Sequence, residues 1–308
     1  MADNTYHYLS VLLAQGSFSK AAKMLDISQP SLSQFVLRLE TETGLELIDR
    51  SVKPLRLTAA GECFMATERK IAQLREVRTK ELADMDLGVR GQVRIGSSHY
   101  RSSYFLPEVL PIFRREHPGI DLTLVEATTE TLENYAAEGT TDFSIVIAPL
   151  MSPDLAGDAI YEEKLLLAAS ATSELARKVP SGPREFDSVD FMLLDNEPFI
   201  TIKRGQKFHS LFQDLCRRCS VAPRIVLESE SPTAALMLTS AGIGSCFVTE
   251  TLARRCPTPQ PVRFFEIRPL VPPRQVIAAY RKNTYLSRPA RALIDVMIQV
   301  GRQSFVHG

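Results

Sequence analysis

The segment spanning residues 17–50 constrains the fold more than any other part of the chain. Ala21 and Ala22 give a first short helix a thin face on which another helix can pack closely. Ser28 then stands where an N-cap hydroxyl belongs, two residues before Pro30, so a second helix is expected to begin there. Two short helices joined by a sharp turn are typical of a helix-turn-helix, whose second helix enters the major groove of DNA. A helical hairpin inside an enzyme is the alternative interpretation.

The second helix is predicted to have two faces of different character. Leu32, Val36 and Leu39 recur at helical spacing and should bury one apolar stripe. The other side carries hydrogen-bonding groups of modest length, which belong to Gln29, Ser31, Ser33, Gln34 and Arg38.

Residues 45–57, which contain Pro54, predict a short two-stranded wing after the second helix. Arg50, Lys53 and Arg56 give this wing alternating positive charge, which suits contact with phosphates or the minor groove. Solvated surface charge is the alternative for each of the three.

This segment resembles the N-terminal domain of LysR-type transcriptional regulators. The match has no gap, and the remaining chain also fits that family in length and order of elements. The matching positions are Ala21, Ala22, Leu25, Ser28, Gln29, Pro30, Ser31, Leu32, Ser33, Leu39, Glu40, Gly44, Leu47, Arg50, Leu57, Thr58, Ala60 and Gly61.

The resemblance implies an α/β protein with an N-terminal winged helix-turn-helix, a long linker helix, and a two-subdomain effector domain like a periplasmic binding protein. It implies a sequence-specific DNA-binding regulator whose dimer reads half-sites about one helical turn apart. Homotetramers are common in the family. The residues expected to contact DNA are Ser28, Gln29, Pro30, Ser31, Ser33, Gln34, Arg38, Arg50, Lys53 and Arg56.

The recognition helix departs from the family pattern at Phe35 and Leu37, where basic or polar residues are usual. Both substitutions remove potential phosphate contacts. Leu37 is expected either to be partly exposed or to pack against the wing or the linker helix. We therefore expect DNA binding to depend less steeply on salt than in a more basic relative.

A long, highly charged helix is predicted from Ala59 to about Asp86, with Thr58 as its cap. Its broken apolar stripe cannot be buried within a single helix, so a second copy of the same helix is the simplest partner. The stripe consists of Phe64, Ile71, Leu74, Leu82 and Met85. Gly88 and Gly91 should then end the helix and supply a hinge.

From Gln92 onward, strands alternate with helices, which predicts a mostly parallel sheet with helices on both faces. One predicted helix spans Tyr104–Glu116. The chain is expected to cross between two subdomains near Ile160–Lys164 and near Ile267–Leu270. The predicted domains are 1–58 for DNA binding, 59–90 for the linker, and 91–308 for the effector. Subdomain I takes about 91–161 and 268–308, and subdomain II about 162–267.

Polar residues follow the predicted strands of both subdomains. Ligands of open parallel sheets lie beyond the carboxyl ends of the strands, near helix N-termini, where free N–H groups suit a small anion. We therefore expect a small organic acid to bind there. The candidate residues are Ser97, Ser98, His99, Tyr100, Arg101, Thr128, Thr129, Thr201, Lys203, Ser229 and Ser231.

Arg101 stands out among these candidates because relatives often carry apolar residues around this stretch. Its guanidinium can bind a carboxylate on the ligand with two parallel hydrogen bonds. It can equally anchor a loop by binding Asp142 or a backbone carbonyl. The sequence leaves both alternatives open, and it indicates a loop or rim position for His99.

The chain contains none of the GxSxG, HExxH, GxxxxGK[ST] or GxGxxG motifs, so no enzyme is predicted. An enzyme or a solute-binding domain fused to a DNA-binding head is the alternative. Cys216 and Cys219 form a CxxC motif, which suits a redox pair or half of a metal site. No second metal-ligand pair accompanies it, and two helix residues three apart explain it as well. No cofactor and no metal are predicted.

The formal net charge is zero, so any DNA-binding charge must be local. Few cysteines, no apolar run long enough to span a bilayer and no basic leader before the apolar residues 8–14 indicate a cytoplasmic protein without membrane contact. The expected partners are double-stranded DNA, the small acid and further copies of the chain, and the sequence leaves contact with RNA polymerase open.

Overall fold

The computed structural model describes residues 4–85, 91–182, 185–203 and 207–305. The chain divides into two units, the first ending at Leu82 and the second beginning at Ala83. Within the described ranges, no helix combines the length and the apolar composition that crossing a membrane requires.

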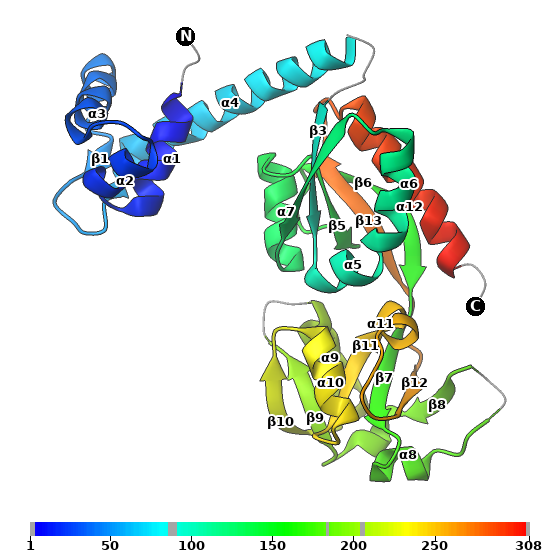
Figure 1. The fold of residues 1–308 in the computed structure, drawn as a ribbon. Coiled ribbons are helices and arrows are strands. Elements are labelled where there is room, and N and C mark those ends of the chain that lie inside the picture. Colours follow the sequence, from blue (N-terminus) through cyan, green and yellow to red (C-terminus); the bar gives the residue numbers. More distant parts are fainter. Residues whose placement is uncertain (1–3, 86–90, 183–184, 204–206, 306–308) are drawn as a thin grey trace. The chain divides into compact units, whose positions relative to one another are not determined.

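The first unit contains the predicted helix-turn-helix and wing (Figure 1). Ser28 caps the second helix of the motif, and its hydroxyl accepts a hydrogen bond from the Ser31 N–H at 3.2 Å. Gly44 ends that helix at φ 70°, a left-handed conformation that favours glycine. The elements are α1 (Thr5–Gln15), α2 (Phe18–Met24), α3 (Gln29–Thr43), β1 (Ile48–Asp49) and β2 (Arg56–Leu57), and β1 and β2 pair antiparallel.

A small apolar core holds these helices together. As predicted, Leu32, Val36 and Leu39 of α3 are buried, and they meet Ala21 and Ala22 of α2 in one cluster. Because alanine side chains are short, α2 and α3 can approach closely, which sets the sharp turn between them.

The linker helix α4 (Ala59–Met85) begins where the sequence predicts, since the Thr58 hydroxyl accepts a hydrogen bond from the Gly61 N–H at 3.0 Å. Parts of its apolar stripe face solvent within the chain, with Leu74 69% and Leu82 58% exposed. The predicted helix end at Asp86 and the predicted hinge at Gly88 lie outside the described residues. Gly91 is the first residue of a strand.

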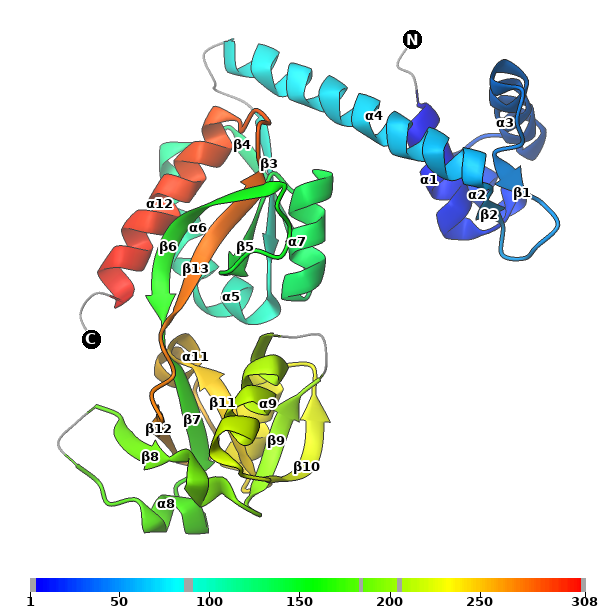
Figure 2. The same cartoon turned by 180° about the vertical axis from the view of Figure 1, so that it is seen from behind.

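The second unit contains two sheets, each covered by helices on both faces (Figures 1 and 2). The first sheet has the strand order β4-β3-β5-β13-β6. Its strands are β3 (Gly91–Ser97), β4 (Ile120–Glu126), β5 (Phe143–Ile147), β6 (Leu155–Glu163) and β13 (Arg274–Arg281), and its helices are α5 (His99–Tyr104), α6 (Leu106–Glu116), α7 (Thr129–Glu138) and α12 (Arg288–Phe305).

Alternation along the strands assigns each helix of the first sheet to a face. Ile145 and Ile147 of β5 belong to the cluster that contains residues of α6 and α12, whereas Val146 belongs to the cluster of α7. Successive strand side chains point to opposite faces, so a fully buried strand such as β5 must be covered on both sides.

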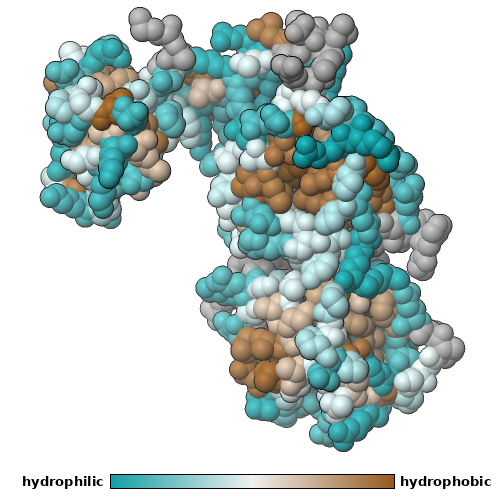
Figure 3. Space-filling model, in the orientation of Figure 1, coloured by the Kyte–Doolittle hydropathy of each residue, from teal (hydrophilic) through white to brown (hydrophobic). Residues whose placement is uncertain are grey.

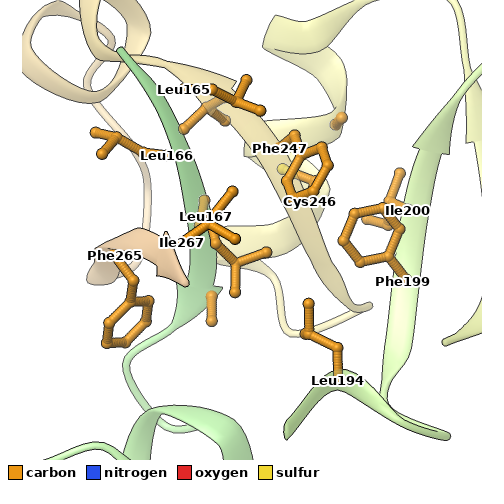
Figure 4. Packing of buried hydrophobic residues seen from close by; sticks show 14 of the residues in the cluster. Leu165, Leu166, Leu167, Leu194, Phe199, Ile200, Cys246, Phe247, Phe265 and Ile267 are labelled. Carbon is orange, nitrogen blue, oxygen red and sulfur yellow. The ribbon is translucent and has the colours of Figure 1, made fainter. Parts of the chain in front are cut away.

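The second sheet has the strand order β10-β9-β11-β7-β12-β8 and the larger core. In Figure 4, Leu167 of β7, Phe199 of β9 and Phe247 of β11 point into the same apolar space. The elements are β7 (Leu165–Ser170), α8 (Glu174–Lys178), β8 (Asp187–Asp190), the 3-10 helix η1 (Phe191–Leu194), β9 (Pro198–Ile202), α9 (Lys207–Cys219), β10 (Arg224–Ser229), α10 (Pro232–Ser240), β11 (Ser245–Thr249), α11 (Glu250–Arg255) and β12 (Val262–Arg268).

Both sheets are mostly parallel, as predicted, with one strand in each that runs against all the others. β13 runs antiparallel to β5 and β6, and β7 runs antiparallel to β11 and β12. β7 and β13 are the strands by which the chain enters a sheet directly after each crossing. The chain passes from β6 to β7 through Lys164, and it returns between the end of β12 and the start of β13.

The predicted helix Tyr104–Glu116 is wrong in its first part. The structure has two helices, α5 and α6, which meet at Phe105. Pro107 lies in the first turn of α6, where its missing N–H costs least, so a new helix begins there. The polar residues that follow β3 therefore lie mostly in α5, whereas we expected a loop there from the sequence.

Candidate functional site

The leading end of α3 presents short polar side chains to solvent. The Ser28 and Ser31 hydroxyls lie 2.7 Å apart, and Gln29 Nε2 donates to the Ser33 hydroxyl at 3.0 Å. Gln34 is exposed as well. These bonds link neighbouring polar side chains along the exposed face of the helix start.

Phe35 and Leu37 behave differently from each other. Phe35 packs edge-on against Tyr8 of α1, with 5.1 Å between ring centroids, and the Arg38 guanidinium lies 5.4 Å from the Phe35 centroid. Leu37 is 57% exposed, which matches the first of the two alternatives for this residue. Phe35 therefore supports the fold of the DNA-binding head, and Leu37 is an apolar residue on its surface.

Glu40 fastens the wing to α3. One carboxylate oxygen accepts the backbone N–H groups of Leu47 at 3.0 Å and Ile48 at 3.3 Å, and the other pairs with Arg50 at 2.7 Å. Part of the charge of Arg50 is thus neutralised within the fold. Lys53 and Arg56 are exposed on the wing.

A cavity of about 360 Å³ lies in the second unit and is lined by residues from both of its sheets and their helices. Small-molecule sites commonly enclose roughly 300–1,000 Å³. Seven of the eleven predicted effector residues line it, namely Ser98, His99, Tyr100, Arg101, Thr128, Thr129 and Ser231. Thr128 and Ser231 are the N-caps of α7 and α10, so two helix N-termini meet at this cavity.

The remaining four predicted residues do not line the cavity. Ser97 and Thr201 are buried, and each hydroxyl donates to the carbonyl of the residue that follows it. Lys203 is exposed and pairs with Glu230 at 2.6 Å, and the Ser229 hydroxyl donates to the Ser231 carbonyl.

Six lining residues are absent from the predicted set: Ala127, Ile147, Phe208, Glu230, Pro232 and Arg274. Ala127, Glu230 and Pro232 adjoin predicted residues, and Ile147 is the last residue of β5, so the rule about strand ends could have included these four. Phe208 lies near the start of α9, and Arg274 opens β13 after the second crossing, where no motif draws attention to it.

Glu163, the last residue of β6, is the centre of a buried charge cluster beside the cavity. Its carboxylate accepts hydrogen bonds from Arg101 Nη2 at 3.3 Å, from the Tyr100 hydroxyl at 3.3 Å, and from the Thr251 hydroxyl at 2.7 Å. Glu163 is fully buried and the Arg101 side chain is 1% exposed. Arg101 therefore pairs with a carboxylate of its own chain, one that neither sequence alternative had named.

Arg274 faces the same carboxylate from the neighbouring strand. Arg274 and Glu163 are cross-strand partners of β13 and β6, and Nη2 lies 3.6 Å from the carboxylate. The guanidinium also lies 4.5 Å from the ring centroid of Phe208. Burial lowers the pKa of Arg274, and the nearby guanidinium of Arg101 lowers it as well. The carboxylate of Glu163 acts in the opposite direction and raises it.

The structure offers no metal centre among the residues it describes, since no three His, Cys, Asp or Glu side chains gather there. Cys216 and Cys219 lie on α9, as one of the two interpretations of the CxxC motif requires. Burial raises the pKa of the Cys216 thiol to about 11, and the neighbouring Cys219 adds to the effect. Such a thiol is mostly protonated at neutral pH and a weak metal ligand or nucleophile.

Comparison with known proteins settles the family. Residues 4–62 match the family described as "Bacterial regulatory helix-turn-helix protein, lysR family", and residues 86–302 match "LysR substrate binding domain". The chain belongs to the LysR family. It is a LysR-type transcriptional regulator with an effector-binding domain, and not an enzyme, because the family consists of regulators. The predicted family and fold are confirmed.

Relatives of the whole chain carry the same organisation. An HTH-type regulator of unknown role from Bacillus subtilis, YcgK, is 28% identical, with 98% of this chain and 95% of that protein covered. Full-length CbnR, solved with its target DNA, is similar at a TM-score of 0.65 and 23% identity, covering 97% of this chain and 99% of CbnR. The effector-binding domain of QuiR, solved with shikimate, is similar at a TM-score of 0.59 and 20% identity, covering 70% of this chain and 99% of that domain.

Proposed function

We propose that this LysR-type regulator binds DNA through residues 1–58 and responds to a small carboxylate-bearing molecule held between the two subdomains of residues 91–308. Residues 59–90 would join the two parts and dimerise. The observation that carries this proposal is the cavity, where two helix N-termini and two arginines converge. Helix N-termini and guanidinium groups both favour negative charge.

DNA contact is assigned to the leading end of α3 and to the wing. Ser28, Gln29, Pro30, Ser31, Ser33, Gln34 and Arg38 would meet the major groove, and Arg50, Lys53 and Arg56 the phosphates or the minor groove. The exposure of the short polar side chains on α3 supports this assignment. The solved complex of CbnR with its target DNA supports it by analogy.

Ligand binding would act on DNA through the arrangement of the two subdomains. Both crossings lie beside the cavity, since Glu163 ends one connecting strand and Arg274 begins the other. A ligand can shift this arrangement only by binding one form more tightly than another. The complex of the QuiR effector domain with shikimate supports a small-molecule ligand here by analogy.

Further copies of the chain are the partners that its surface favours. The exposed stripe of α4 and the sheet edges carry apolar residues, with Leu124 on β4 42% and Ile225 on β10 43% exposed. Figure 3 shows brown surface at β10 and near β4. Exposed apolar edges of this kind are normally covered. We place the homodimer or homotetramer in the cytoplasm, where bacterial DNA lies, with RNA polymerase as a further partner to be tested.

The test of DNA recognition uses the purified chain and the DNA upstream of its own gene. Binding should exceed binding to shuffled DNA, and Gln34→Ala should lower the preference, whereas Thr41→Ala near the end of the same helix should not. Because Phe35 and Leu37 are apolar, we expect only roughly two to four phosphate contacts per subunit. A plot of log affinity against log salt concentration should then have a slope of about −0.9 for each contact. Equal binding to shuffled DNA would refute the proposal.

A further inference from the structure

The buried cluster around Glu163 contains more positive than negative charge. Arg101 and Arg274 are both cations, and Glu163 is the carboxylate that faces them. Glu230 also lines the cavity, but it is exposed and its charge is taken by Lys203. Counting only the residues that the structure describes, one positive charge is therefore left without a counter-ion in the interior of the cavity.

Hydrogen-bond donors in this cluster also outnumber acceptors. The Glu163 oxygens already accept bonds from Arg101, Tyr100 and Thr251. Among the described residues, Nε and Nη2 of Arg274 have no hydrogen-bond partner, although both atoms are buried. A buried donor without a partner costs about 1–3 kcal/mol, and more when it is charged. An incoming anion would remove this cost.

The walls next to Arg274 are largely apolar. Phe208 covers one face of the guanidinium, and Ala127, Ile147 and Pro232 line the same cavity. An apolar ligand body would thus be desolvated against these side chains while an anionic group reached Arg274. A ligand with a second strong charge would have to bury it against apolar surface or hold it at the rim.

We infer that the ligand is a monoanionic carboxylate with an apolar body, and that Arg274 is the residue that binds its carboxylate and selects for it. This inference rests on the proposed function, whose ligand site it occupies. Arg101 is held by Glu163, so it supports the site without being the main contact. With the carboxylate of the ligand bound, the cluster contains two guanidiniums and two carboxylates, so its charges balance.

The test measures thermal stabilisation of the full-length protein by matched probes. Benzoate and cyclohexanecarboxylate should stabilise it, and their uncharged amides should do so much less. Phthalate, succinate and inorganic phosphate should bind more weakly than the two monocarboxylates. Arg274→Gln should weaken binding of the monocarboxylates about tenfold or more, since charge-assisted hydrogen bonds are lost. Arg281→Gln, at the far end of the same strand, is the matched control and should leave binding intact.

A purely structural role for Arg274 makes a different prediction. In that case Arg274→Gln would lower the melting temperature without ligand, whereas a ligand-binding role leaves that temperature unchanged or higher, because Glu163 keeps Arg101 as partner. The inference is overturned if no monocarboxylate binds, if amides, dicarboxylates or phosphate bind as well, or if Arg274→Gln binds normally. Preference for the upstream DNA, measured on the same protein, decides the proposed function separately.

Discussion

Replacing Glu163 by glutamine would leave two buried guanidiniums without a counter-ion. Glutamine keeps the shape of the side chain and one oxygen that can accept a hydrogen bond, so the change removes mainly charge. Because Glu163 is fully buried, solvent screens little of the effect. Breaking a buried pair by removing one partner costs roughly 3–5 kcal/mol. For a unit of this size each kcal/mol lowers the melting temperature by about 2–4 °C, which predicts a fall of roughly 6–20 °C.

The measurement is thermal and urea unfolding of the full chain, followed by circular dichroism. Glu162→Gln is the matched control, because Glu162 is the preceding residue of the same strand and is exposed. Its stability should change by less than about 0.5 kcal/mol. A loss confined to the transition of the second unit would place the effect in the charge cluster.

The double variant separates charge from packing. Adding Arg274→Gln to Glu163→Gln removes one of the two repelling cations, so the double variant should be more stable than Glu163→Gln alone. Residues in direct contact commonly couple by about 0.5–3 kcal/mol. The reasoning is refuted if Glu163→Gln costs less than about 1 kcal/mol, or if Arg274→Gln destabilises it further.

Three further predictions concern other parts of the chain. Gly61→Ala should destabilise the first unit by about 1–3 kcal/mol in urea unfolding, because a Cβ would lie 2.0 Å from the Leu47 carbonyl oxygen, and unchanged stability would contradict that packing. At pH 8, iodoacetamide should label the exposed Cys63 well before Cys216. The pKa of Cys216 is raised from 9.0 to about 11, which lowers its thiolate population about a hundredfold. Equal labelling of the two in mass spectrometry would argue against burial of Cys216. Leu74→Glu should lower the mass of the oligomer in light scattering if α4 pairs through its exposed stripe, and an unchanged mass would remove Leu74 from that interface.

The DNA-binding head could be predicted from the sequence because its determinants are local. Ser28, Pro30 and Gly44 mark helix ends through the backbone of their own helix, and Leu32 and Val36 are buried by their spacing alone. Each of these signals acts over a few residues, so no knowledge of the tertiary fold is needed to interpret it.

The sheets were harder to predict because strand direction depends on distant partners. Phe143–Ile147 is recognisable as a buried strand from its own residues, but its antiparallel neighbour begins at Arg274, more than a hundred residues later. A local sequence pattern does not indicate which strands lie next to the passages between the two subdomains. The reversed direction of β7 and β13 therefore emerges only when the chain has crossed and returned.

The residues of the ligand cavity also fall into two groups, those that local sequence signals mark and those that meet only in the tertiary fold. Ser98, Thr128 and Ser231 follow strands and cap helices, so a rule about strand ends finds them. Arg274 and Glu163 meet only because the two crossing strands pair with each other. Two of the three charges of the buried cluster thus come from the strands that join the subdomains, and under our proposal a ligand that neutralises Arg274 would act on that connection. On this pairing rests our expectation that the cavity binds a carboxylate more tightly than the corresponding amide.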